Sequence, residues 1–79
     1  MNLTLYHFEG CSYCTLVRDF MLKNNISIPL KDIHKSAAAK AELLKIGGKT
    51  QVPCLVIDGR ALYESLDIIA WLKNNWKKL

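Results

Sequence analysis

The 79-residue sequence lacks the segments that would direct a chain into or across a membrane. It has no basic-then-apolar signal segment at its N-terminus, and the apolar stretch at residues 68–72 is far too short to span a bilayer. Its three cysteines are an odd number, which does not suit the disulfide framework of a small secreted protein. We therefore expect a soluble cytoplasmic protein with reduced thiols and no membrane association.

The sequence also has little excess charge of one sign. Eleven basic and seven acidic side chains give a net charge of +4, which falls well short of a nucleic-acid-binding surface. Hydrophobic residues make up 51% and charged residues 23%, an ordinary globular balance that excludes a disordered chain. Because there are no repeats or linkers, we expect one domain over residues 1–79. We also expect a monomer, and the small net charge predicts no nucleic-acid binding.

Strand patterns occur in four places. Apolar residues suited to strands cover residues 2–7, 26–33, 54–57 and 60–63. Pro29 inside the second strand is tolerable near a sheet edge or at a strand start. Asp58-Gly59 separates the last two strands by a two-residue hairpin turn.

Helical patterns fill the remaining segments. One starts at Ser12 and stops at residues 24–25, and another runs from an N-cap at Ser36 to about residue 46. Ser65 is the expected N-cap of the last helix, whose last turn includes Lys77 and Lys78. Its predicted apolar stripe consists of Leu66, Ile69, Leu72 and Trp76.

The order β-α-β-α-β-β-α predicts an α/β, thioredoxin-like fold. Two strands joined through a helix pair in parallel, and the hairpin adds two antiparallel strands. The result is a mixed four-stranded sheet covered by three helices.

The segment Cys11-Ser12-Tyr13-Cys14 lies where the first strand passes into the first helix. A thiolate at a helix N-terminus faces unpaired backbone N–H groups and the positive end of the helix dipole, which favour the reactive form. Cys11 is exposed there as the nucleophile, and Cys14, one turn in, is placed to resolve a disulfide formed on it. The alternatives are two structural cysteines, or half of a zinc site completed by Cys54, His7 or His34.

Cys54 follows a proline at the start of an apolar strand. Buried cysteine behaves as a small hydrophobe, so packing is the favoured interpretation. A regulatory disulfide with Cys11 is the alternative.

Three segments together resemble the glutaredoxins over essentially the whole chain. They are Cys11-Ser12-Tyr13-Cys14, Gln51-Val52-Pro53 before a strand, and residues 63–68 (Tyr-Glu-Ser-Leu-Asp-Ile) at the start of the last helix. The last segment is most similar to the glutaredoxin subgroup that resembles the N-terminal domain of glutathione S-transferases.

The resemblance implies a glutathione-dependent thiol–disulfide oxidoreductase that acts on protein–glutathione mixed disulfides and protein disulfides. Pro53 matches the family's cis-proline, and the Val52 backbone matches the segment that pairs with the cysteinyl part of glutathione. Glu64 and Ser65 match the pair that holds the γ-glutamyl end, and Tyr13 matches a tyrosine that flanks the tripeptide. Glutathione is then the reductant, and no metal cofactor is expected.

The sequence departs from the family pattern at several points. Ser12 replaces the commoner proline, and Phe8 stands where many glutaredoxins carry a lysine. Because the sequence ends at Leu79 without the helical second domain of the transferases, we expect no conjugating activity. The alternative functions are a carrier of a [2Fe-2S] cluster ligated by Cys11 and glutathione, and a redoxin reduced by a thioredoxin reductase.

Overall fold

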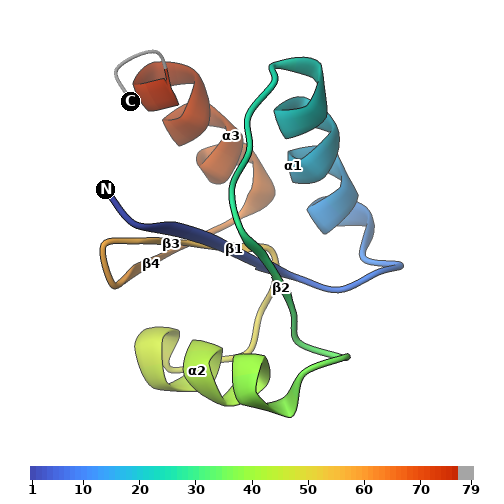
Figure 1. Cartoon of the computed structure of the whole chain (residues 1–79), viewed down its shortest axis with the longest axis vertical. Coiled ribbons are helices and arrows are strands. Elements are labelled where there is room, and N and C mark those ends of the chain that lie inside the picture. The colour runs from blue at the N-terminus through green and yellow to red at the C-terminus, as the bar shows by residue number, and fades with distance from the viewer. Residues whose placement is uncertain (77–79) are drawn as a thin grey trace.

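The computed structural model describes residues 1–76, which form helices and strands in the predicted order (Figure 1). These are β1 (Leu3–His7), α1 (Ser12–Lys23), β2 (Leu30–Asp32), α2 (Ala37–Gly47), β3 (Cys54–Ile57), β4 (Arg60–Tyr63) and α3 (Ser65–Asn75). Within these residues, no helix is both long enough and apolar enough to cross a membrane.

The four strands form one mixed sheet in the order β2-β1-β3-β4. β1 pairs in parallel with β2, and β3 pairs antiparallel with both β1 and β4. The parallel pair requires a crossover connection, which α1 supplies. Figure 1 shows α1 and α3 on one face of the sheet and α2 on the other. The predicted α/β thioredoxin-like arrangement is therefore confirmed.

The sheet separates two hydrophobic cores. Successive residues of a strand point to opposite faces, so Leu5 belongs to one core and Tyr6 to the other. The core under α1 and α3 contains Leu5, Val17, Met21, Ile26, Ile28, Leu55, Ile68 and Leu72. The core under α2 contains Tyr6, Ile33, Ala39, Leu43, Cys54 and Val56. Neither face of the sheet is left open to solvent, as expected for a parallel pair with a crossover helix.

α2 is closed at both ends by local hydrogen bonds. The Ser36 hydroxyl accepts from the Ala39 N–H at 3.1 Å, which confirms the predicted N-cap. At the other end, Gly48 has a φ of 78° and its N–H donates to the Leu44 carbonyl at 2.8 Å. Gly47, one residue earlier, lies against the Tyr63 hydroxyl, which occupies the space that a Cβ would need.

A polar cluster ties α2 to the sheet. The Tyr6 hydroxyl donates to Glu42 Oε1 at 2.9 Å, and Lys31 Nζ lies 2.6 Å from the same oxygen. Burial, followed by the hydrogen bond to Glu42, raises the pKa of Tyr6 to about 12. One carboxylate thus joins α2 to β1 and β2.

The second strand is shorter than the pattern predicted. It covers only Leu30–Asp32, although Ile26 and Ile28 are buried in the core under α1 and α3. The Pro29 carbonyl accepts from the Leu5 N–H at 2.9 Å, so pairing with β1 begins at the proline. The residues before it alternate like a strand but run along the core without a ladder partner. The edge position expected from Pro29 is confirmed.

The start of α3 also differs from the prediction. Glu64 is the N-cap, with a φ of 71° and no side-chain cap, and Ser65 is the first helical residue. The predicted apolar stripe is wrong at Leu66, which is 74% exposed, because Ser65, Ile68 and Leu72 form the buried side. Lys77 and Lys78 lie outside the described residues.

Candidate active site

Cys11 and Cys14 lie in the first turn of α1 in unequal environments. Cys11 is the N-cap of the helix, and its Sγ accepts from the Cys14 N–H at 3.2 Å. Its side chain is partly exposed, whereas Cys14 is fully buried. The two thiols are free. The Cys11 sulfur therefore lies at the helix N-terminus and is accessible from the surface, whereas the Cys14 sulfur is buried.

The Cys14 thiol is held in its protonated form. Burial, followed by the hydrogen bond with the Cys11 side chain, raises the pKa of Cys14 to about 12. At neutral pH this residue is a thiol that donates toward Cys11. The backbone N–H of Cys14 also donates to the Cys11 sulfur, so this sulfur is the acceptor at the start of the helix.

Two side chains near this turn, His7 and Arg18, each carry a buried nitrogen atom without a hydrogen-bond partner in the described chain. His7, at the end of β1, is only 6% exposed, and its Nδ1 has no hydrogen-bond partner. Arg18, one turn after Cys14 on α1, has a buried Nε that is also unpartnered. The Arg18 Nη2 donates to Thr15 Oγ1 at 3.3 Å, and Thr15 donates to the Cys11 carbonyl at 3.1 Å. In the sequence, His7 was a candidate zinc ligand only, and no signal pointed to Arg18.

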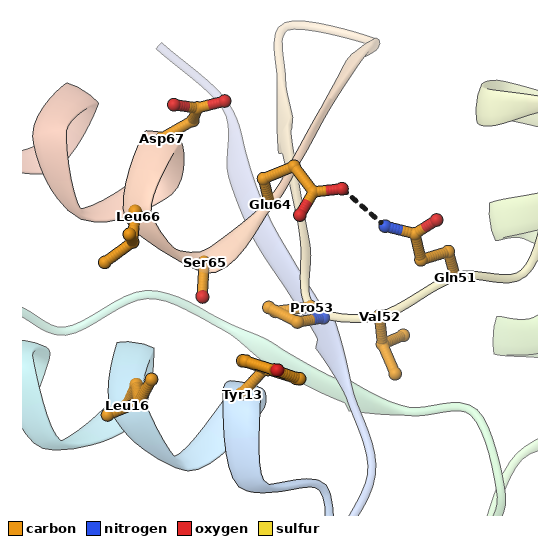
Figure 2. Close-up of a pocket in the computed structure, with 9 residues that line it drawn as sticks. All are labelled: Tyr13, Leu16, Gln51, Val52, Pro53, Glu64, Ser65, Leu66 and Asp67. Atoms are coloured by element: carbon orange, nitrogen blue, oxygen red, sulfur yellow. Dashed lines mark hydrogen bonds between the residues drawn. The ribbon is translucent and has the colours of Figure 1, made fainter.

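A cavity of about 670 Å³ opens beside the starts of α1 and α3 (Figure 2). Its lining consists of Tyr13, Leu16, Gln51, Val52, Pro53, Glu64, Ser65, Leu66 and Asp67. The structure thus brings together the five residues predicted to contact glutathione, which come from three separate segments of the chain. Cys11 and Cys14 do not line the cavity, and Tyr13, between them in sequence, is its contact with the cysteine turn.

Val52 and Pro53 form the wall of the cavity that leads into β3. The peptide bond between them is cis, as the resemblance implied. Pro53 is buried and Val52 is partly exposed. Within the described chain, the backbone N–H and carbonyl of Val52 make no backbone hydrogen bond. An extended peptide laid along this segment can therefore pair with it as an added strand does.

The start of α3 forms the opposite wall. Because Glu64 provides no side-chain cap, the N–H groups of the first turn are left without a partner in the described chain. Ser65 is 7% exposed, and Figure 2 shows its hydroxyl directed toward the space between Tyr13 and Pro53. An uncapped helix N-terminus with a hydroxyl beside it suits a carboxylate.

Glu64 is held in an unusual conformation at this wall. Its φ of 71° lies in the left-handed region that side chains other than glycine rarely adopt. Its carboxylate accepts from Gln51 Nε2 at 3.1 Å, which links the two walls of the cavity (Figure 2). Strained residues of this kind cluster at binding sites, where the surrounding structure fixes them.

Four lining residues were not predicted as site residues. Gln51 and Asp67 lie inside the segments that carried the resemblance, which assigned no role to either. Leu66 was assigned to the apolar stripe of the last helix, but Leu66 and Leu16 are 74% and 49% exposed. Their exposure was the missing signal, because a sequence pattern does not show which apolar residues face a cavity.

Cys54 is placed away from the cysteine turn. It is fully buried in the core under α2, whereas α1 packs on the other face of the sheet. Burial raises the pKa of Cys54 to about 11, so it is a thiol at neutral pH. These observations fit the packing role and not a disulfide with Cys11. Among residues 1–76, no three His, Cys, Asp or Glu side chains gather closely enough to hold a metal ion.

Comparison with known proteins agrees with this geometry. Residues 5–77 match the family described as glutathione S-transferase, N-terminal domain. Glutaredoxin 3 of Escherichia coli K12 is 29% identical over 69 residues, which are 87% of this chain and 83% of that protein.

Solved structures give the same result. The crystal structure of a thioredoxin-like protein superposes with a TM-score of 0.77 at 28% identity, covering 90% of this chain and 99% of that one. Glutaredoxin 2 from Salmonella typhimurium, solved in complex with glutathione, superposes with a TM-score of 0.77 at 29% identity. That alignment covers 94% of this chain and 34% of the longer protein.

Proposed function

Because the chain belongs to the family of glutathione S-transferase N-terminal domains, we propose that it is a glutathione-dependent thiol–disulfide oxidoreductase of the glutaredoxin type. The observation that carries this proposal is the inequality of the two cysteines in the first turn of α1. Cys11 is the accessible nucleophile, and its sulfur accepts a backbone hydrogen bond. Cys14 is the buried resolving thiol. We place the activity in the cytoplasm, where thiols are kept reduced.

The reaction begins when the Cys11 thiolate attacks the glutathione sulfur of a protein–glutathione mixed disulfide. A Cys11–glutathione disulfide forms, and the protein sulfur leaves as a thiol after taking up a proton. A second glutathione then attacks this adduct, which restores the Cys11 thiolate and releases oxidised glutathione. For a disulfide within a protein, the Cys14 sulfur attacks the Cys11 adduct instead and forms a Cys11–Cys14 disulfide. Two glutathione molecules then reduce this disulfide and leave as oxidised glutathione.

The cavity supplies contacts for the cysteinyl and γ-glutamyl parts of glutathione. The unpaired Val52 backbone pairs with the cysteinyl unit and presents its sulfur toward the cysteine turn. The uncapped N-terminus of α3 and the Ser65 hydroxyl receive the γ-glutamyl carboxylate, while Glu64 receives the ammonium group. Tyr13 and the ring of Pro53 flank the peptide on its apolar sides.

A coupled assay with two alternative reductants tests the proposal. The purified chain is given a glutathionylated peptide and NADPH, with either glutathione and glutathione reductase or thioredoxin reductase alone. We expect turnover with the glutathione system and none with thioredoxin reductase. Turnover that depends on thioredoxin reductase and is indifferent to glutathione would overturn the proposal.

Cys14→Ser tests the division of labour between the cysteines. This variant should retain deglutathionylation, which needs only Cys11 and glutathione, and should lose most of its activity on a protein disulfide such as that of insulin. Equal losses on the two substrates would contradict the assigned roles.

A further inference from the structure

Two buried nitrogen atoms beside the cysteine turn have no role in the function proposed above. His7 Nδ1 and Arg18 Nε are the buried side-chain polar atoms that lack a hydrogen-bond partner in the described chain. Leaving such atoms unpaired is unfavourable, so two of them, close enough for the Arg18 charge to act on His7, call for a reason. A neutral imidazole nitrogen accepts a hydrogen bond and a guanidinium Nε–H donates one, so a single water molecule satisfies both.

The two atoms lie on the same side of the sheet as Cys14. Residues of β1 alternate between the faces, so His7 points to the face of Leu5, which α1 covers. Cys14 and Arg18 are four residues apart on α1 and therefore lie one above the other. The Phe8 backbone, directly after His7, hydrogen-bonds to the Cys14 sulfur, and the Arg18 charge acts on both His7 and Cys14.

Cys14 has a chemical difficulty that these residues resolve. As a resolving thiol it must lose its proton while it attacks, yet it is fully buried and its pKa is raised to about 12. Only a minute fraction is ionised at neutral pH, so a nearby acceptor that removes the proton during the attack accelerates the step.

We propose that His7, with a water molecule held between it and Arg18, accepts the proton of Cys14 when Cys14 attacks the Cys11 mixed disulfide. The inference rests on the resolving role proposed above. The Cys14–Cys11 bond forms as the bond between Cys11 and the substrate sulfur breaks. The proton passes through the water to His7 Nδ1, and the imidazolium then returns it to the departing thiolate. The substrate sulfur is reduced to a thiol while the two cysteines are oxidised to a disulfide.

The charges around His7 keep it ready to accept. Burial, then the Arg18 charge, lower its pKa below the ordinary value, and Lys35 acts in the same direction. Asp32 on β2 and Glu9 after β1 oppose them. With burial and Arg18 as the largest causes, the lowered pKa favours the neutral, proton-accepting ring at pH 7 and above.

A two-phase reaction with 5,5′-dithiobis(2-nitrobenzoate) separates the two cysteines. One equivalent of reagent reacts first at Cys11 and releases one coloured thiolate, and Cys14 then displaces a second. Both phases are followed from pH 5.5 to pH 9.5 in the wild type, in His7→Gln and in the control His34→Gln, which changes an exposed histidine. General acid–base catalysis is worth about 10²–10⁴-fold, so we expect the second phase of His7→Gln to slow at least tenfold at pH 7.

The pH dependence distinguishes proton transfer from a structural effect. In His7→Gln the second phase should rise about tenfold per pH unit, as hydroxide replaces the lost acceptor, while the first phase stays unchanged. A wild-type second phase in this variant, or equal losses in both phases, would overturn the inference. If His7→Gln fails to fold, Arg18→Lys decides in the same assay. That variant keeps the charge but removes Nε, so an unchanged second phase overturns the water-bridged arrangement.

No glutathione is present in this assay, so its outcome is separate from that of the proposed function. Cys14→Ser must lose the second phase altogether. If it does not, the resolving role of Cys14 fails, whatever His7 does.

Discussion

The two faces of the sheet handle their polar groups in opposite ways. On the α2 face they find partners within the chain: Ser36 caps the helix, Glu42 binds both Tyr6 and Lys31, and the Tyr63 hydroxyl donates to the Lys49 carbonyl. On the other face, within the described residues, the N–H groups in the first turn of α3, His7 Nδ1 and Arg18 Nε have no partner. We therefore expect the face covered by α2 to contribute mainly to stability. The face covered by α1 and α3 has unpaired polar groups that can bind a ligand or accept a proton.

Substituting one cysteine on each face of the sheet, Cys11 or Cys54, is the sharpest test of this difference between the faces. Cys11→Ser should reduce turnover of a glutathionylated peptide by a factor of about 10³ or more, because the other two thiols, Cys14 and Cys54, are buried. Its midpoint of urea unfolding should remain close to that of the wild type. Cys54→Ala should do the reverse and keep the turnover number while lowering the midpoint. Comparable activity losses in the two variants would remove the distinction between the faces.

Truncation of a core residue under α2 should affect stability alone. Leu43 is fully buried there, and Leu43→Ala is expected to lower the free energy of unfolding by about 2–5 kcal/mol. Urea unfolding followed by circular dichroism measures this loss. Turnover per folded molecule, measured at low temperature, should be unchanged. A large rise in KM for glutathione would show that the α2 core shapes the cavity more directly than the two-face comparison allows.

Gly47→Ala probes the contact between the end of α2 and Tyr63, the last residue of β4. A methyl group at Gly47 would overlap the Tyr63 hydroxyl, so the ring must move, at a cost of about 1–3 kcal/mol. Tyr63 directly precedes Glu64, so the KM for glutathione should rise together with the loss of stability. Adding Tyr63→Phe removes the overlapping oxygen and should recover part of both losses. If the double variant is no better than Gly47→Ala, the overlap is not the cause.

The smallest effect is a loss of stability at alkaline pH. The folded-state pKa of Cys54 is raised above its unfolded value of 9.0 to about 11. Its contribution is therefore complete below pH 9 and is lost as the pH rises through 11, by about 1–2 kcal/mol. Tyr6 and Cys14, both raised to about 12, act in the same direction at higher pH. Unfolding midpoints at pH 8 and pH 10.5 should differ less in Cys54→Ala than in the wild type. An equal difference in both proteins would assign the alkaline loss to other groups.

Most of the fold follows from local signals in the sequence. The Ser36 cap, the Asp58-Gly59 turn and the change of period after Gly10 each depend on residues within a few positions of one another. The glutathione segments were assigned through the resemblance to the glutaredoxins, and the structure brings Val52, Glu64 and Tyr13 to one cavity. Local propensity and tertiary packing agree at these positions.

The features that could not be predicted depend on distant parts of the chain. Ile26 and Ile28 alternate like a strand, but the parallel ladder with β1 begins only at Leu30, and local alternation does not show where such a ladder starts. Glu64 adopts a positive φ that its own side chain does not favour, which moved the helix start by one residue. The burial of His7 is set by what packs over it from α1, and a lone histidine at a strand end does not reveal that.

The sulfur of Cys11 also caps the N-terminus of α1, so the Cys14 amide that donates to it should respond to the redox state of Cys11. The Cys14 amide donates to that sulfur at 3.2 Å, and a disulfide sulfur is a much poorer acceptor than a thiolate. Each time Cys11 is consumed, the amide loses its partner, and its nitrogen resonance and exchange rate should change with it. The progress of the catalytic cycle can thus be followed at one backbone position, without a label on either substrate.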